Sequence, residues 1–122
     1  MLKKIILYCS IYGALFSQVI QHQPEESIFS DSPLYIEVFS DINYNDIASF
    51  NIFYRSNNQN IYIKDNLTYL SNNDYSYTIK PNFLNGQYIE YYILMEMKDN
   101  SYQTFPKYDA HNNPISVRVS SP

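Results

Sequence analysis

The clearest pattern in the chain is an alternation of apolar and more polar positions across residues 88–98. The positions on one side of this period-two pattern are Ile89, Tyr91, Ile93, Met95 and Met97. Those on the other side are Glu90, Tyr92, Leu94 and Glu96. Because successive side chains of a strand point to opposite faces, the pattern predicts a long strand with one packed face and one wetter face.

Other segments show the same alternation and serve as candidate partners for this strand. They are residues 34–39, 49–55, 61–64, 75–79, 102–105 and 115–119, with 67–70 as a continuation of 61–64 after a break. Clusters of Asn, Asp, Ser and Pro separate them about every ten residues, as turns do in all-β domains. No segment shows a helical period. We therefore predict an all-β, antiparallel two-sheet sandwich of about seven strands.

The first residues follow a different pattern, which is typical of a secretory signal peptide. Lys3 and Lys4 precede an apolar run from Ile5 to Phe16, and small Ser17 is followed by polar residues. We predict a signal helix over residues 1–17 that is removed on export. The apolar run is shorter than the ~20 residues that cross a bilayer, so we expect no membrane span after cleavage. An uncleaved anchor is the alternative.

This division suggests three parts: a signal peptide (1–17), a lead-in segment (18–32) and a sandwich domain (33–120). Within the lead-in segment, one short edge strand is expected around Ile28 and Phe29. Export places the mature protein in the periplasm, at the cell surface or in the extracellular medium. The same signal serves all three destinations.

Cysteine usage limits the chemistry of the mature chain. Cys9 is the single cysteine, and it lies within the predicted signal peptide. The mature domain therefore has no disulfide, thiol nucleophile or thiolate zinc site, and burial alone must stabilise it.

The charge balance disfavours two classes of partner. The whole chain has a net charge of −4, and removal of Lys3 and Lys4 leaves six basic against twelve acidic side chains. Nucleic acids and anionic membrane surfaces both attract clusters of Lys and Arg, which this chain lacks. We expect no nucleic-acid partner.

Four short segments occur in a distinctive order. They are Phe53-Tyr54-Arg55, Tyr75 to Ile79 followed by Pro81, Glu90-Tyr91-Tyr92-Ile93 followed by Asp99, and a return with Pro106, Asn113, Pro114 and Val117. Over roughly residues 20–119 this order resembles the immunoglobulin-like, fibronectin-type-III-like modules of secreted bacterial proteins. The chain departs from their pattern at Lys80 and at Asn100-Ser101, both in loops. The resemblance implies an immunoglobulin-like sandwich and an exported location, and it implies no catalytic residues.

Possible metal and catalytic sites are weakly supported, and we predict no metal, cofactor or catalytic residue. The segment from Asp41 to Asp46 begins like a calcium loop, but it lacks the glycine and the bidentate glutamate of such loops. Its oxygens also suit ordinary turns. His22 and His111 lie in segments read as loops, without the spacing of a metal site or a catalytic triad.

Tyr88 and Tyr92 are the candidate ligand-binding residues, because both lie with Glu90 on the wetter face of the long strand. Tyrosine rings suit stacking against sugars, since one end is apolar and the other is polar. Alternatively, the two rings cover the sheet or contact a neighbouring domain. A further alternative for Tyr88 is a buried corner tyrosine near the start of its strand.

The sequence therefore favours a non-catalytic exported module with a structural or interaction role. Its expected partner is another protein or a neighbouring domain, and the chain is expected to be the N-terminal part of a larger protein. A carbohydrate-binding module that uses Tyr88 and Tyr92 is the alternative. A small secreted enzyme has the least support.

Overall fold

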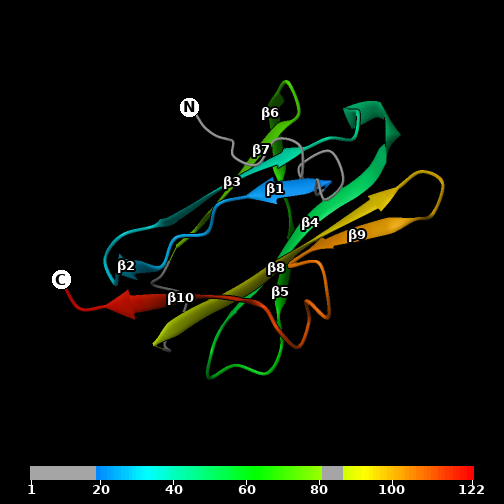
Figure 1. The fold of residues 1–122 in the computed structure, drawn as a ribbon. Helices are drawn as coiled ribbons and strands as arrows, with labels where there is room; N and C mark the ends of the chain where they lie inside the picture. The colour runs from blue at the N-terminus through cyan, green and yellow to red at the C-terminus, as the bar shows by residue number, and fades with distance from the viewer. Residues whose placement is uncertain (1–18, 81–86) are drawn as a thin grey trace, which may run out of the picture.

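A computed structural model describes residues 19–80 and 87–122. In these ranges the chain forms ten strands and a 3-10 turn, η1 (Tyr44–Asp46), without any α-helix. The strands form two sheets, as predicted, and Figure 1 shows their arrangement. The predicted signal helix and Pro81 lie outside the described residues. None of the helical segments in the described ranges is long and apolar enough to span a membrane.

The first sheet has four strands in the order β1-β3-β7-β6. They are β1 (Ile20–His22), β3 (Leu34–Ser40), β7 (Asp74–Ile79) and β6 (Thr68–Ser71). All pairs in this sheet are antiparallel, in agreement with the prediction.

The second sheet has six strands, of which five follow the order β2-β10-β8-β4-β5. They are β2 (Ser27–Phe29), β10 (Ile115–Ser120), β8 (Tyr88–Met97), β4 (Ile47–Ser56) and β5 (Ile63–Asn66). The sixth, β9 (Tyr102–Phe105), pairs with β8 beyond the end of β10, so both lie along one edge of β8. The β2–β10 pair is parallel, an exception to the predicted antiparallel sheet.

The core lies between the sheets, and alternate residues of β3 and β8 supply much of it. Leu34, Ile36 and Val38 face it from the first sheet, and all three are buried. Tyr91 and Ile93 face it from the second sheet and are also buried. Burial of such a side chain contributes about 1.5–3 kcal/mol, so this layer is the main source of stability. The inward faces predicted from the alternation are confirmed.

The prediction of about seven strands is too low, partly because β5 and β6 belong to different sheets. We expected residues 67–70 to continue the preceding strand, but the chain crosses to the first sheet at Leu67. The Leu67 side chain is buried and its N–H donates to Phe50 O at 2.9 Å. A buried apolar residue between two exposed strands therefore marks the crossover.

The other additional strands come from the lead-in segment. Ile28 lies in β2, the short edge strand expected there, and Ile20 lies in β1 with its side chain in the core. Residues 20–22 therefore join the first sheet and residues 27–29 join the second. Segments this short have too few residues to show a clear alternation, which is why β1 was not predicted.

Candidate functional site

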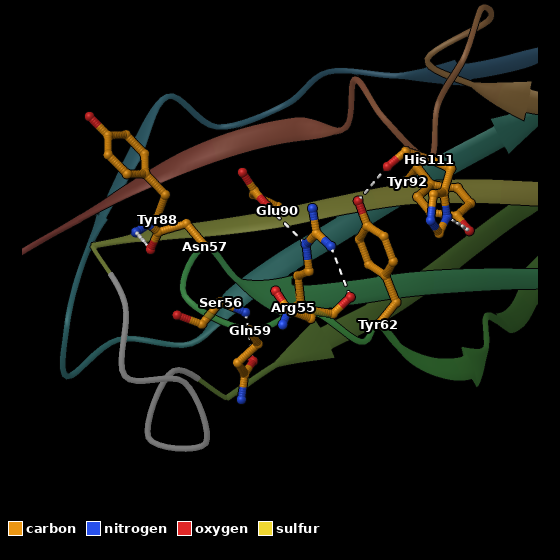
Figure 2. A network of polar contacts seen from close by, with 10 residues as sticks. Arg55, Ser56, Asn57, Gln59, Tyr62, Tyr88, Glu90, Tyr92 and His111 are labelled. Carbon is orange, nitrogen blue, oxygen red and sulfur yellow. Dashed lines mark hydrogen bonds and ion pairs between the residues drawn. The ribbon is translucent and has the colours of Figure 1, made fainter.

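The outer face of the second sheet carries a connected group of aromatic and charged side chains. Figure 2 labels five of them: Arg55, Tyr62, Glu90, Tyr92 and His111. We call it the outer cluster, and its members are Phe53, Arg55, Tyr62, Glu90, Tyr92 and His111. They come from β4, from β8, from the residues before β5 and from the loop before β10. The group is therefore assembled from four separate parts of the chain.

The register between β4 and β8 creates the centre of the cluster. Phe53 lies opposite Tyr92, and their rings stack with centroids 4.8 Å apart. Arg55 lies opposite Glu90, and its Nε donates to Glu90 Oε1 at 2.9 Å. These side chains are 21% and 24% exposed, so solvent screens the ion pair and its contribution is modest. The Arg55 guanidinium also lies 4.1 Å from the centre of the Tyr62 ring.

Within this cluster, Tyr92 is covered by the other rings and is not exposed on the surface. Its side chain is 8% exposed, because Phe53 stacks on it and the rings of Tyr62 and His111 meet it edge-on. Its hydroxyl lies 3.2 Å from His111 Nδ1. Burial raises the pKa of Tyr92, and the nearby charge of Arg55 partly offsets this shift.

Tyr88 lies on the same face of β8, as the alternation predicted, but in a different environment. It is the first residue of the strand and is 38% exposed, and its N–H donates to Asn57 Oδ1 at 3.1 Å. The structure thus places Tyr88 at the exposed start of the strand and Tyr92 beneath other rings. The two do not form one continuous exposed strip.

The loop of residues 106–114 is closely tied to the outer cluster. Tyr62 donates its hydroxyl to His111 O at 2.8 Å, and the His111 ring packs against Tyr92. Ala110 beside it is buried. The aromatic rings of the sheet therefore support this loop from below.

Asp109 organises the same loop from within. The N–H groups of Asn112 and Asn113 both donate to Asp109 O, at 3.1 and 2.9 Å. The side-chain amides of these two asparagines donate to the Asp109 carboxylate, at 3.0 and 3.2 Å. Asp109 has a φ of 49°, a left-handed conformation that Asp adopts more readily than most residues. Local hydrogen bonds thus tie Asp109 to Asn112 and Asn113 within the loop.

Tyr108 projects from this loop into solvent and is 77% exposed. The Lys107 ammonium lies 5.6 Å from the centre of its ring. Tyr108 lies in no periodic pattern, so the sequence did not indicate it as a binding residue. The signal available was its position between Pro106 and Pro114 in a segment rich in Asn and Asp.

His22 provides the main correction to the sequence analysis. We expected a loop histidine, but it lies in β1, half-buried between the sheets. Its Nδ1 contacts Glu37 O at 2.7 Å and therefore carries the hydrogen, because a carbonyl can only accept. Its Nε2 contacts the Tyr91 hydroxyl. Burial lowers the pKa of His22, although the bond to Glu37 O opposes this shift. His22 is thus a polar link between the two sheets.

The Asp41–Asp46 segment behaves as a turn. Asn43 caps η1 by accepting the Asn45 N–H on its side-chain oxygen at 3.0 Å. Within residues 19–80 and 87–122, no three acidic, histidine or cysteine side chains are grouped as metal ligands would be.

Glu96, on the outer face of β8, accepts a hydrogen bond from Ser49 Oγ at 2.9 Å.

Comparison with known proteins does not assign the chain to a family. None of the known protein-family models matches it, and no curated protein matches its sequence. What is established is an all-β sandwich of two sheets.

Proposed function

We propose that the chain is a non-catalytic, exported immunoglobulin-like module that binds a protein partner through the 106–114 loop. The partner is a separate protein or a neighbouring domain of a larger chain. The observation that carries the proposal is Tyr108, a 77% exposed aromatic side chain on a loop that is held in place by its own hydrogen bonds.

The strand order supports the immunoglobulin-like part of the proposal. The order β1-β3-β7-β6 corresponds to strands A, B, E and D of that fold. The order β10-β8-β4 corresponds to G, F and C, with β5 in the place of an additional C′ strand. In this correspondence β9 and β10 share the position of strand G, and the 106–114 loop interrupts that strand.

The energetics of binding support a role for the loop. Ordering a flexible loop on binding costs free energy, and a loop that is already ordered avoids this cost. Tyrosine is among the residues that most often dominate protein interfaces, because its ring is large and has few rotatable bonds. A loop that has its own internal hydrogen bonds and presents Tyr108 combines both advantages.

The environments of the two histidines support the absence of catalysis. In the described part of the chain, His22 contacts a tyrosine hydroxyl and a backbone carbonyl, and His111 also contacts a tyrosine hydroxyl. Catalytic triads instead place a histidine between a nucleophile and an orienting carboxylate.

Export is proposed from the pattern of residues 1–17 alone.

The alternative, a carbohydrate-binding module that uses Tyr88 and Tyr92, has less support. A sugar ring stacks on an open aromatic face, whereas Phe53 covers one face of Tyr92 and the edges of two further rings surround it. Tyr88 alone remains available at 38% exposure.

The test compares Tyr108→Ala with Tyr35→Ala, an exposed tyrosine on β3 in the other sheet. The immobilised protein first captures partners from secreted and envelope fractions of its source. A purified partner is then titrated against both variants by calorimetry. We expect Tyr108→Ala to weaken binding about 30-fold, which corresponds to about 2 kcal/mol, and Tyr35→Ala to leave it unchanged. Equal binding by Tyr108→Ala and the wild type contradicts the proposal.

A further inference from the structure

A polar link joins β1, the strand at one end of the first sheet, to the second sheet. β1 pairs with β3 over three residues, and the Asp41 N–H beyond them donates to Val19 O at 2.9 Å. The Ile20 side chain is buried in the core. A short strand at a sheet end has few hydrogen bonds, so it opens more easily than the centre of the sheet. The contacts of His22, the last residue of β1, therefore affect how firmly this strand is held.

The hydrogen bonds of His22 determine which of its ring nitrogens carries the proton. Nδ1 donates to Glu37 O at 2.7 Å, so Nε2 of the neutral ring is an acceptor. The Tyr91 hydroxyl donates to this Nε2. Burial lowers the pKa of His22 more than the bond to Glu37 O raises it, so the neutral ring prevails at pH 7. The link between the sheets thus depends on an unprotonated Nε2.

Protonation of His22 disrupts this arrangement, because both ring nitrogens become donors. In the described ranges, His22 is the one hydrogen-bond partner of the Tyr91 hydroxyl. The Tyr91 side chain is fully buried, and this burial, with the charge of Glu25, raises the pKa of Tyr91, so the hydroxyl keeps its own proton. One of the two facing donors is then left without an acceptor, which is unfavourable for a buried group.

The surroundings of His22 offer the protonated ring other acceptors. The ring also lines an open hollow of about 530 Å³ beside β1, β3 and β7. Four other ionisable side chains line this hollow: Glu25, Tyr35, Glu37 and Asp74. From the second sheet, β8 contributes the uncharged Tyr91 and β9 contributes Phe105, whose ring meets His22 edge-on. Three carboxylates therefore lie on the side of the hollow, and none of these second-sheet contacts is charged.

We propose that His22 is a pH-sensitive latch on β1. When the ring is protonated, it leaves Tyr91 for the acidic hollow, and β1 separates from β3 more often. Each opening uncovers the edge of β3 and the core position of Ile20. The opening is local, because the opposite side of the sandwich is joined by a different contact, in which the Tyr77 hydroxyl donates to Asp65 Oδ2 at 2.6 Å. The latch does not depend on the 106–114 loop.

The first experiment measures amide hydrogen exchange by NMR at pH 7 and pH 5, corrected for the intrinsic exchange rate at each pH. The reporters are Asp41 and the β1 amides that are protected at pH 7. The reference is the Leu67 N–H, which donates to Phe50 O on the opposite side of the sandwich. At pH 5 we expect the protection of the reporters to fall about tenfold, through the loss of about one buried hydrogen bond, and that of Leu67 to change less than about twofold.

In the wild type, the fall in protection should follow the titration of the His22 ring signals. An equal fall at the reporters and at Leu67 would show global destabilisation. Either that result, unchanged protection at the reporters, or a midpoint that differs from the titration of His22 overturns the proposal.

The second experiment separates the titration of His22 from the packing of its ring. His22→Gln does not titrate, so the ratio of Asp41 protection between pH 7 and pH 5 should fall to about one, even if β1 is looser at both pH values. His111→Gln removes the other histidine of the chain and is the matched control, so it should keep the tenfold ratio. A tenfold ratio in His22→Gln, or its loss in His111→Gln, contradicts the latch.

Discussion

The outer cluster and a second aromatic group differ in how their hydroxyl groups are satisfied. The second group consists of the packed rings of Tyr44, Tyr69 and Tyr75, beside the β5–β6 crossover. In the outer cluster, Tyr62 donates to His111 O and the Tyr92 hydroxyl contacts the His111 ring. In the second group, the hydroxyl of Tyr75 is buried and has no protein partner. The first region is complete without a ligand, and its rings serve to hold a loop. In the second, a buried hydroxyl is left without a protein partner, which is unfavourable for the folded state.

The largest expected effect tests whether Tyr92 is a structural support. Tyr92→Ala removes a nearly buried ring that contacts three other rings, so we expect a loss of about 3–5 kcal/mol in the free energy of unfolding. Tyr88→Ala, on the same face of β8 but exposed, should cost less than about 1 kcal/mol. Urea denaturation measures both. Similar losses in the two variants would show that the ring packing around Tyr92 contributes little.

The next effect concerns the ionisation of Tyr75 and appears at alkaline pH. The pKa of Tyr75 is about 12 in the folded protein, above its usual value of 10.0. A raised folded pKa stabilises the fold below pH 10, and this stabilisation is lost as the pH rises towards 12. Tyr75→Phe lacks the ionising group.

Relative to Tyr75→Phe, the wild type should therefore lose about 2 kcal/mol of stability by pH 12. Urea denaturation at several pH values between 9 and 12 provides the measurement. Other buried tyrosines titrate in both proteins, so only the difference between the two curves reports on Tyr75. Parallel curves would mean that Tyr75 ionises as freely as in the unfolded chain.

A smaller effect is expected at acidic pH, from the link between the sheets. Burial lowers the pKa of His22 in the folded state, so protonation favours the unfolded chain. The stability contributed by neutral His22 is complete above the usual histidine pKa of 6.5 and is lost as the pH falls below that value. His22→Gln should show a flatter dependence of Tm on pH between 7 and 5. An unchanged slope would assign the acid sensitivity to other groups.

The smallest effect concerns the ion pair of the outer cluster. Both Arg55 and Glu90 are partly exposed, so a double-mutant cycle with Arg55→Gln and Glu90→Gln should give a coupling energy below about 1 kcal/mol. Added salt should reduce this coupling further, because solvent ions screen exposed charges. A larger coupling that is insensitive to salt would indicate that the pair is effectively buried.

The sequence predicted the strands that have a long alternating pattern. In β3 and β8 the inward residues, such as Ile36 and Tyr91, were identified because the alternation of side chains is a local property of an extended chain. The predicted strand at residues 61–70 was less accurate. Both halves are strands, but nothing in the local pattern indicates that Leu67 carries the chain from one sheet to the other.

The candidate site was predicted only in part. The face of β8 that carries Tyr88 and Tyr92 was correct, but the covering of Tyr92 depends on Tyr62 and His111, which are distant in the sequence. Tyr108 was missed for the related reason that exposure on a loop has no periodic signature. The role of His22 depends on its contact with Tyr91, 69 residues away.

By itself, the sequence determined that this chain folds as sheets and which side of each long strand faces the core, because both follow from the order of apolar and polar residues along a few neighbouring positions. The tertiary structure alone decided which tyrosines are covered, which remain exposed and which buried hydroxyls have no partner. These properties depend on side chains that are far apart in the chain and meet only when the two sheets pack together.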